Sequence, residues 1–138
     1  MLTKFLGYFN FKKAGWKDIL ASFFKLSFVK IFLIFTILCN LLLWLLSWLV
    51  VVNINQELSI LHYNIIFGID YIGNPYSIFW LPAFGLAIAL VNILGSLWFF
   101  KREKLLAQML MLSTLVFHIF LGLSLYSIYL INFVNIKF

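Results

Sequence analysis

Three long apolar runs are separated by short segments that contain most of the charged positions. The runs cover residues 31–52, 78–100 and 105–131. Each is longer than the ~20 residues that a helix needs to cross the hydrocarbon core of a bilayer. Three runs offer too few strands to close a barrel, so helices are the structure that satisfies every backbone group in lipid. The pattern therefore predicts an all-α integral membrane protein with three transmembrane helices.

The segment before the first run, residues 1–30, has an amphipathic pattern. Lysines fall mainly between apolar residues that recur at helical spacing, namely Leu2, Phe5, Leu6, Phe9, Trp16, Ile19, Leu20 and Phe23. This pattern is typical of helices that lie in the membrane interface, with lysines toward anionic head groups. We therefore divide the chain into an interfacial segment, 1–30, and a three-helix membrane domain, 31–138. In the alternative interpretation, residues 1–30 are a basic tail that only fixes the orientation of the first span.

The composition supports a membrane protein. The chain has 138 residues, of which 65% are hydrophobic and 10% charged, and a soluble domain of this size could not bury so much apolar surface. The single cysteine, Cys39, lies inside the first run, which leaves neither a disulfide framework nor a cysteine-rich metal site. That run is too long for a signal peptide and lacks a small-residue cleavage site after it, so we expect an uncleaved span.

The basic residues predict the orientation of the chain. Residues 101–104 read KREK, residues 53–77 contain no lysine or arginine, and six lysines precede the first run, namely Lys4, Lys12, Lys13, Lys17, Lys25 and Lys30. By the positive-inside rule, the N-terminus and residues 101–104 are cytoplasmic, and residues 53–77 and the C-terminus lie outside. We expect the bacterial cytoplasmic membrane as the location. The net charge of +6 adjoins a bilayer, so a nucleic-acid partner is not expected.

The connection between the first two spans, residues 53–77, mixes polar residues with large apolar ones. It is too apolar for an unstructured external linker, and Asn74 followed by Pro75 is typical of a turn. We therefore expect a short ordered external loop. Its recognition surface, or alternatively its structural lock, would be formed by His62, Asn64, Gly68 and Asp70.

The same loop is the only segment outside the spans that combines a histidine with carboxylates. Glu57, His62 and Asp70 could together bind a divalent metal ion, but the paired ligands of a typical zinc motif are absent, so this alternative is weakly supported. The motifs Gly-x-Ser-x-Gly and His-Glu-x-x-His and the phosphate-binding glycine loops are absent from the sequence as well. We therefore expect neither an enzyme nor a bound cofactor.

Polar residues within the spans are few, and we single out Asn40, Asn92 and His118 as candidates for hydrogen bonds between helices. Counted from the cytoplasmic end of each predicted span, Asn40 and Asn92 lie at similar depth, and His118 lies further out, near the midplane. One hypothesis is a proton or ligand path, since ionisable residues inside a membrane are functional candidates. We prefer an interhelical clamp of hydrogen bonds, because the predicted spans contain no aspartate, glutamate, lysine or arginine to relay or balance a charge.

Part of the sequence resembles a known family. The segment HYNIIFGID, residues 62–70, followed by WLPAFGLAIAL, residues 80–90, resembles the external-loop motif and the next span of the SdpI-type immunity protein family. The family pattern is roughly Pro-x-His-x-Asn-x-x-Gly-x-x-Asp and then Leu-Pro, and His62, Asn64, Gly68 and Asp70 match it in type and order. Ile60 replaces the proline, and the glycine is one position late. The segment HYNIIFGID followed by Leu-Pro also resembles small three-span bacterial membrane proteins. This likeness extends over the full length of the chain.

We consider three functional hypotheses, and the resemblance implies no catalytic residue for any of them. We prefer a small, non-enzymatic inner-membrane protein that binds a partner protein or ligand through its external loop. The immunity family implies, as an alternative, protection against a membrane-active toxin or a sensor of an envelope ligand. A third hypothesis is an accessory subunit of a transporter or membrane enzyme, with Asn92 and His118 in a shared site. A membrane-protein partner and a homo-oligomer are both compatible with the sequence.

Overall fold

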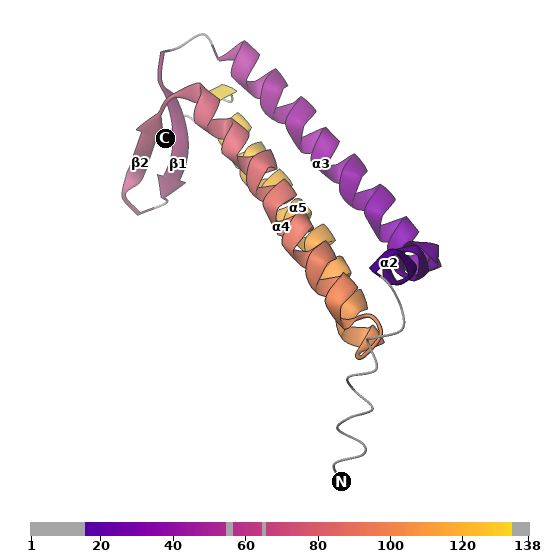
Figure 1. Cartoon of the computed structure of the whole chain (residues 1–138). Helices are drawn as coiled ribbons and strands as arrows, with labels where there is room; N and C mark the ends of the chain where they lie inside the picture. Colours follow the sequence, from indigo (N-terminus) through magenta and orange to yellow (C-terminus); the bar gives the residue numbers. More distant parts are fainter. Residues whose placement is uncertain (1–15, 55–56, 65, 134–138) are drawn as a thin grey trace.

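The computed structural model describes residues 16–54, 57–64 and 66–133, and it is mostly helical (Figure 1). Three long helices lie side by side, a short helix crosses one end, and a β-hairpin is attached at the other end. In chain order the elements are α2 (Trp16–Lys25), α3 (Ser27–Asn53), β1 (Ser59–Asn64), β2 (Gly68–Gly73), the 3₁₀ helix η2 (Pro75–Phe79), α4 (Trp80–Phe99) and α5 (Lys104–Phe133).

The predicted spans are confirmed as three helices that are long and apolar enough to cross a membrane, so the chain is a multi-pass membrane protein. Their bounds differ modestly from the prediction. The first helix begins at Ser27 rather than Ile31, and therefore includes Lys30 in its first turns. The second begins as the 3₁₀ helix η2 and continues as α4, and the third extends to Phe133.

The buried residues of α3 form a stripe with alternating three- and four-residue spacing, which is the period of helices in left-handed bundles. The stripe is Val29, Thr36, Asn40, Leu43, Ser47 and Val50. On α4 the corresponding stripe contains small residues, namely Pro82, Gly85, Ala89 and Ser96. Large leucines, isoleucines and phenylalanines point away from the bundle on all three helices. Small and polar residues between helices, with large apolar residues outside, are typical of helices that pack within lipid.

Three residues define the start of the second span, namely Asn74, Pro75 and Pro82. The Asn74 side chain accepts a hydrogen bond from the backbone N–H of Tyr76 at 2.9 Å, which caps η2, and Pro75 follows as its first residue. Pro82 lies in the first turn of α4, where a backbone N–H would have no partner within the helix. Pro82 is therefore a residue of the helix start and does not break the span.

Helix α2 covers the second half of the amphipathic pattern, and part of its apolar face contacts protein. Phe23 is fully buried, its ring centroid lies 5.2 Å from that of Phe100, and it packs with Val29 and Met111. Leu20 and Phe24 remain exposed. The apolar face is therefore divided between the bundle and the surroundings. The first half of the pattern, from Leu2 to Phe9, lies outside the described residues.

The connection between the first two spans was predicted as an ordered loop within an all-α protein, and it contains two strands, because β1 and β2 form an antiparallel hairpin there. The residues of this segment are rich in isoleucine and tyrosine, which favour strands. Asn64 pairs with Gly68 at the turn, and Gly68 has φ 78°, a conformation that residues with a Cβ rarely adopt. The predicted ordered loop is thus a folded hairpin.

Candidate functional site

The hairpin brings together two of the four residues predicted for the connection. The Nδ1 atom of His62 on β1 lies 2.6 Å from Oδ1 of Asp70 on β2, so the ring N–H donates to the carboxylate. Both side chains are accessible, with 64% of the His62 side chain and 39% of the Asp70 side chain exposed. The strand register is irregular on both sides of His62, and an irregularity of this kind re-aims the side chains around it.

The other two predicted residues, Asn64 and Gly68, form the turn. Oδ1 of Asn64 accepts a hydrogen bond from the backbone N–H of Ile66 at 2.8 Å. This contact forms an Asx turn, in which the side-chain oxygen takes the place of a backbone carbonyl oxygen. Gly68 supplies the left-handed backbone conformation opposite Asn64. Their geometry is therefore that of residues that shape the hairpin, whereas His62 and Asp70 are presented on its surface.

Asn132, near the end of α5, attaches the hairpin to the helices. Its Oδ1 accepts from the backbone N–H of Ile60 at 3.0 Å, and its Nδ2 donates to the carbonyl oxygen of Ile60 at 2.7 Å and to that of Ile128 at 2.8 Å. One amide side chain thus satisfies both backbone groups of a strand residue 72 positions away in the sequence. The sequence analysis missed this residue. The only available signal was an asparagine at the boundary of an apolar run.

The geometry does not support the metal alternative within the described residues, since no group of three His, Cys, Asp or Glu side chains lies close enough to bind one ion there. Glu57 therefore does not join His62 and Asp70. The pair that remains can form hydrogen bonds and, when His62 is protonated, an ion pair. This chemistry suits recognition of a polar surface.

Within the spans, Asn40 of α3 and His118 of α5 are buried and adjacent. Nδ2 of Asn40 donates to the carbonyl oxygen of Pro82 on α4 at 3.0 Å and lies 3.4 Å from Nε2 of His118. Nδ1 of His118 lies 2.8 Å from the carbonyl oxygen of Thr114, which can only accept, so this nitrogen carries the proton. Nε2 is then the acceptor for Asn40. Two side chains and one backbone carbonyl thus join all three long helices.

Gly85 on α4 provides the space for this cluster. A Cβ at this position would lie 3.0 Å from Nδ2 of Asn40, 3.1 Å from Cδ1 of Leu121 and 3.3 Å from Nε2 of His118. These separations are shorter than ordinary van der Waals contacts. A Cβ at position 85 would therefore force the neighbouring side chains, including Asn40 and His118, to move away from the α4 backbone by a few tenths of an ångström.

Asn92, the third polar residue predicted within the spans, lies in a separate cluster. Its Nδ2 donates to Oγ of Ser113 at 3.2 Å and to Oγ1 of Thr114 at 3.0 Å. Nearer to the turn that joins α4 and α5, Oγ of Ser96 donates to the carbonyl oxygen of Ala107 at 3.0 Å. The predicted residues therefore form two interhelical contacts, one between three helices and one between α4 and α5.

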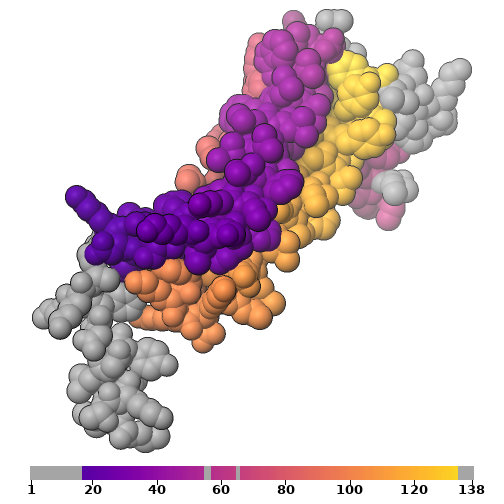
Figure 2. All heavy atoms as spheres, turned by 90° about the vertical axis from the view of Figure 1, so that its right-hand side faces the viewer, coloured from indigo at the N-terminus to yellow at the C-terminus, as the bar shows by residue number. Residues whose placement is uncertain are grey.

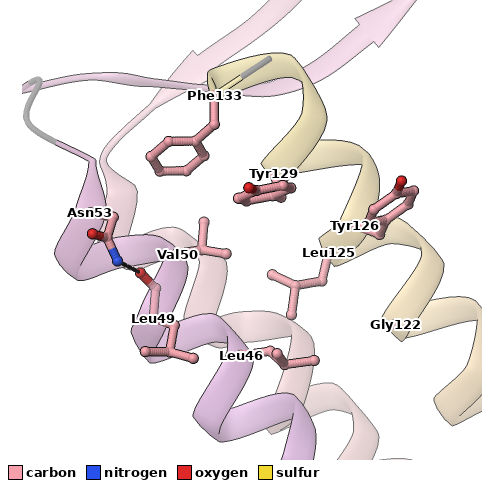
Figure 3. Close-up of a pocket in the computed structure, with 9 residues that line it drawn as sticks. All are labelled: Leu46, Leu49, Val50, Asn53, Gly122, Leu125, Tyr126, Tyr129 and Phe133. Carbon is pink, nitrogen blue, oxygen red and sulfur yellow. Dashed lines mark hydrogen bonds between the residues drawn. The ribbon is translucent and has the colours of Figure 1, made fainter.

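A groove of about 710 Å³ lies between α3 and α5 near the hairpin (Figure 3). Its walls are Leu46, Leu49, Val50 and Asn53 from α3 and Gly122, Leu125, Tyr126, Tyr129 and Phe133 from α5. The Nδ2 atom of Asn53 donates to the Leu49 carbonyl of its own helix at 2.8 Å. The groove is thus mainly apolar and contains no charged side chain, and its chemistry suits the hydrocarbon chains that surround spanning helices.

Comparison with known proteins leaves the family open. No family model, curated protein or solved structure matches this chain. The resemblance of residues 62–90 to the SdpI-type immunity proteins stays a prediction.

Proposed function

We propose that this is a non-enzymatic protein of the bacterial cytoplasmic membrane, and that it binds a partner protein or ligand through the β1–β2 hairpin on the outer side. One observation carries the proposal. The hairpin is fixed to α5 by the two hydrogen bonds between Asn132 and Ile60, whereas the His62–Asp70 pair on it remains accessible. An element that is fixed at its base and exposes a polar pair is suited to recognition, because little conformational entropy is lost on binding.

The distribution of charge supports an outward-facing hairpin. Every lysine and arginine among the described residues belongs to α2, to the start of α3 or to residues 101–104. These segments lie at one end of the bundle, where Phe23 of α2 contacts Phe100, and the hairpin lies at the other end (Figure 1). By the positive-inside rule the basic end faces the cytoplasm. Helix α2, which crosses that end (Figure 2), is then placed for contact with anionic head groups.

The immunity or sensor hypothesis is a special case of this proposal, in which the bound partner is a toxin or an envelope ligand. The accessory-subunit hypothesis has less support. Both ring nitrogens of His118 lie within hydrogen-bond distance of groups of this chain, which leaves neither nitrogen for a site shared with another subunit. Asn92 likewise uses its amide N–H groups between α4 and α5.

Site-specific photocrosslinking in living cells tests the proposal. A benzophenone amino acid replaces Tyr71 on β2 or, as a matched control, Tyr126 on α5, and each of these tyrosines is 57% exposed. We expect an adduct of discrete mass from position 71 and none from position 126. The adduct should disappear when Asp70→Ala is added at an unchanged protein level. Absence of a specific adduct at position 71 would contradict the proposal, and an adduct of twice the chain mass would identify the partner as a second copy.

A further inference from the structure

We infer that the turn of the hairpin inserts into the lipid of the leaflet at the hairpin end of the bundle. The hairpin would then contact the membrane directly, in addition to the three spans. This inference is independent of the partner proposed above, because it concerns the hairpin and the bilayer alone.

The first observation is the exposure of the turn. Ile66 and Phe67 are 82% and 80% exposed, the highest values among the large apolar side chains of the described residues. Adjacent large apolar side chains that are exposed in this way are a feature of surfaces that contact a membrane or another protein. Asn64 and Gly68 fix the backbone on either side of them.

The second observation is the direction in which the turn points. In Figure 1 the hairpin does not extend away from the bundle; it folds back beside the adjoining ends of α4 and α5. Figure 2 shows the same placement from the side, with the hairpin beside α5 and below the end of that helix. The turn therefore points toward the level of the membrane-spanning segments.

The third observation is that the hairpin is long enough for its turn to reach the hydrocarbon core. The 30 residues of α5 correspond to ~45 Å of helix, so α5 extends ~7 Å beyond each side of a ~30 Å hydrocarbon core when centred in it. Asn132 holds Ile60 at the end of this helix. The strand from Ile60 to Asn64 covers ~13 Å in the opposite direction. Such a strand reaches back past the ~7 Å overhang, which places Ile66 and Phe67 at the hydrocarbon boundary.

The fourth observation is continuity with the surface that contacts lipid. Along the chain from the turn, Ile69 and Ile72 of β2 are exposed, and so are Tyr76 of η2 and Trp80 at the start of α4. Tyrosine and tryptophan are enriched at the level of the head groups. The exposed apolar side chains thus continue from the turn of the hairpin to the outer surface of α4.

The polar residues of the hairpin are compatible with this depth. The charged groups of the described hairpin strands are His62 and Asp70, which contact each other at 2.6 Å. They lie between the turn and the base that Asn132 holds. A pair that satisfies its own hydrogen bonds costs less to place among head groups than an isolated charge does.

Spin labels at single cysteines test the inference in proteoliposomes that contain only this protein. In a Cys39→Ser background, the label is placed at Phe67→Cys and, separately, at Ile66→Cys. Glu57→Cys is the aqueous control, and Val91→Cys, on the exposed side of α4, is the lipid control. Collisions with oxygen report contact with lipid, and collisions with a nickel chelate report contact with water. We expect both turn labels to collide more with oxygen than with the chelate, as the Val91 label does.

Chelate accessibility at both turn positions equal to that of the Glu57 label would overturn the inference. A second arm uses the native side chains. A phospholipid with a photoreactive group near the top of its acyl chain should modify the segment 59–73 of the wild-type chain. It should modify the variant that combines Ile66→Ser and Phe67→Ser several-fold less. An unmodified hairpin in the wild type would also overturn the inference. Since no partner protein is present, failure here leaves the crosslinking test of the proposed function intact.

Discussion

The attachment of the hairpin to α5 depends on one side chain, and its removal should release the hairpin without unfolding the bundle. Asn132→Leu keeps the approximate size of the residue and removes both hydrogen bonds to Ile60. Each bond contributes roughly 0.5–1.5 kcal/mol net to stability. The variant should therefore lose about 1–3 kcal/mol of the free energy that favours the attached hairpin over the open one. Since 1.4 kcal/mol is a factor of ten in an equilibrium constant, local opening should become roughly 5- to 150-fold more frequent.

Hydrogen–deuterium exchange of the protein in lipid nanodiscs measures this opening. Backbone N–H groups that form the β1–β2 ladder, between Ser59 and Gly73, should exchange faster in the variant by the factor given above. Backbone N–H groups in the middle of α4 and α5 should be unaffected, because Asn132 does not contact them.

The matched control is Asn53→Leu. Asn53 is an asparagine at the same end of the bundle, and its Nδ2 donates to the Leu49 carbonyl of its own helix. This variant should leave exchange in the hairpin unchanged. Equal exchange in wild type and Asn132→Leu, or equal acceleration in both variants, would refute the proposed attachment.

Three further substitutions test the rest of the account. Gly85→Ala should lower the stability of the bundle by about 1–3 kcal/mol in detergent titrations, because its Cβ would lie 3.0 Å from Nδ2 of Asn40; unchanged stability would contradict the close packing. His118→Leu should cost about 0.6–2 kcal/mol, as expected for an interhelical hydrogen bond in a membrane, with crosslinking at position 71 retained. Loss of crosslinking at normal stability would instead favour a functional His118. Asp70→Ala should change the melting temperature little, because an exposed ion pair contributes about 0–1 kcal/mol; a large drop would favour the structural-lock interpretation instead.

The spans could be predicted from the sequence because lipid imposes a simple rule on long uncharged segments. The contacts between the spans were harder to predict from the sequence. Asn40 was expected to lie at the depth of Asn92, but α3 begins at Ser27 and not at Ile31, so Asn40 lies deeper in the bundle and is level with His118. An error of a few residues in a helix boundary was therefore enough to change the predicted depth of a buried side chain.

The hairpin was predictable only as an ordered loop. Its strands are short and contain isoleucines on both faces, so the alternation that identifies a half-buried strand is absent. The pairing of His62 with Asp70 depends on the strand register and on its irregularity, and the attachment by Asn132 joins distant positions. Neither of these contacts has a local sequence signal.

The central claim is that the hairpin and the basic end of the bundle lie on opposite sides of a membrane. Two single-cysteine variants are made in a Cys39→Ser background: Glu57→Cys, beside the hairpin, and Glu103→Cys, in the KREK turn. Intact spheroplasts that contain either variant are then treated with a membrane-impermeant maleimide. The account predicts labelling at position 57, with labelling at position 103 only after the membrane is permeabilised. Labelling at position 103 but not at position 57 in intact spheroplasts would contradict it.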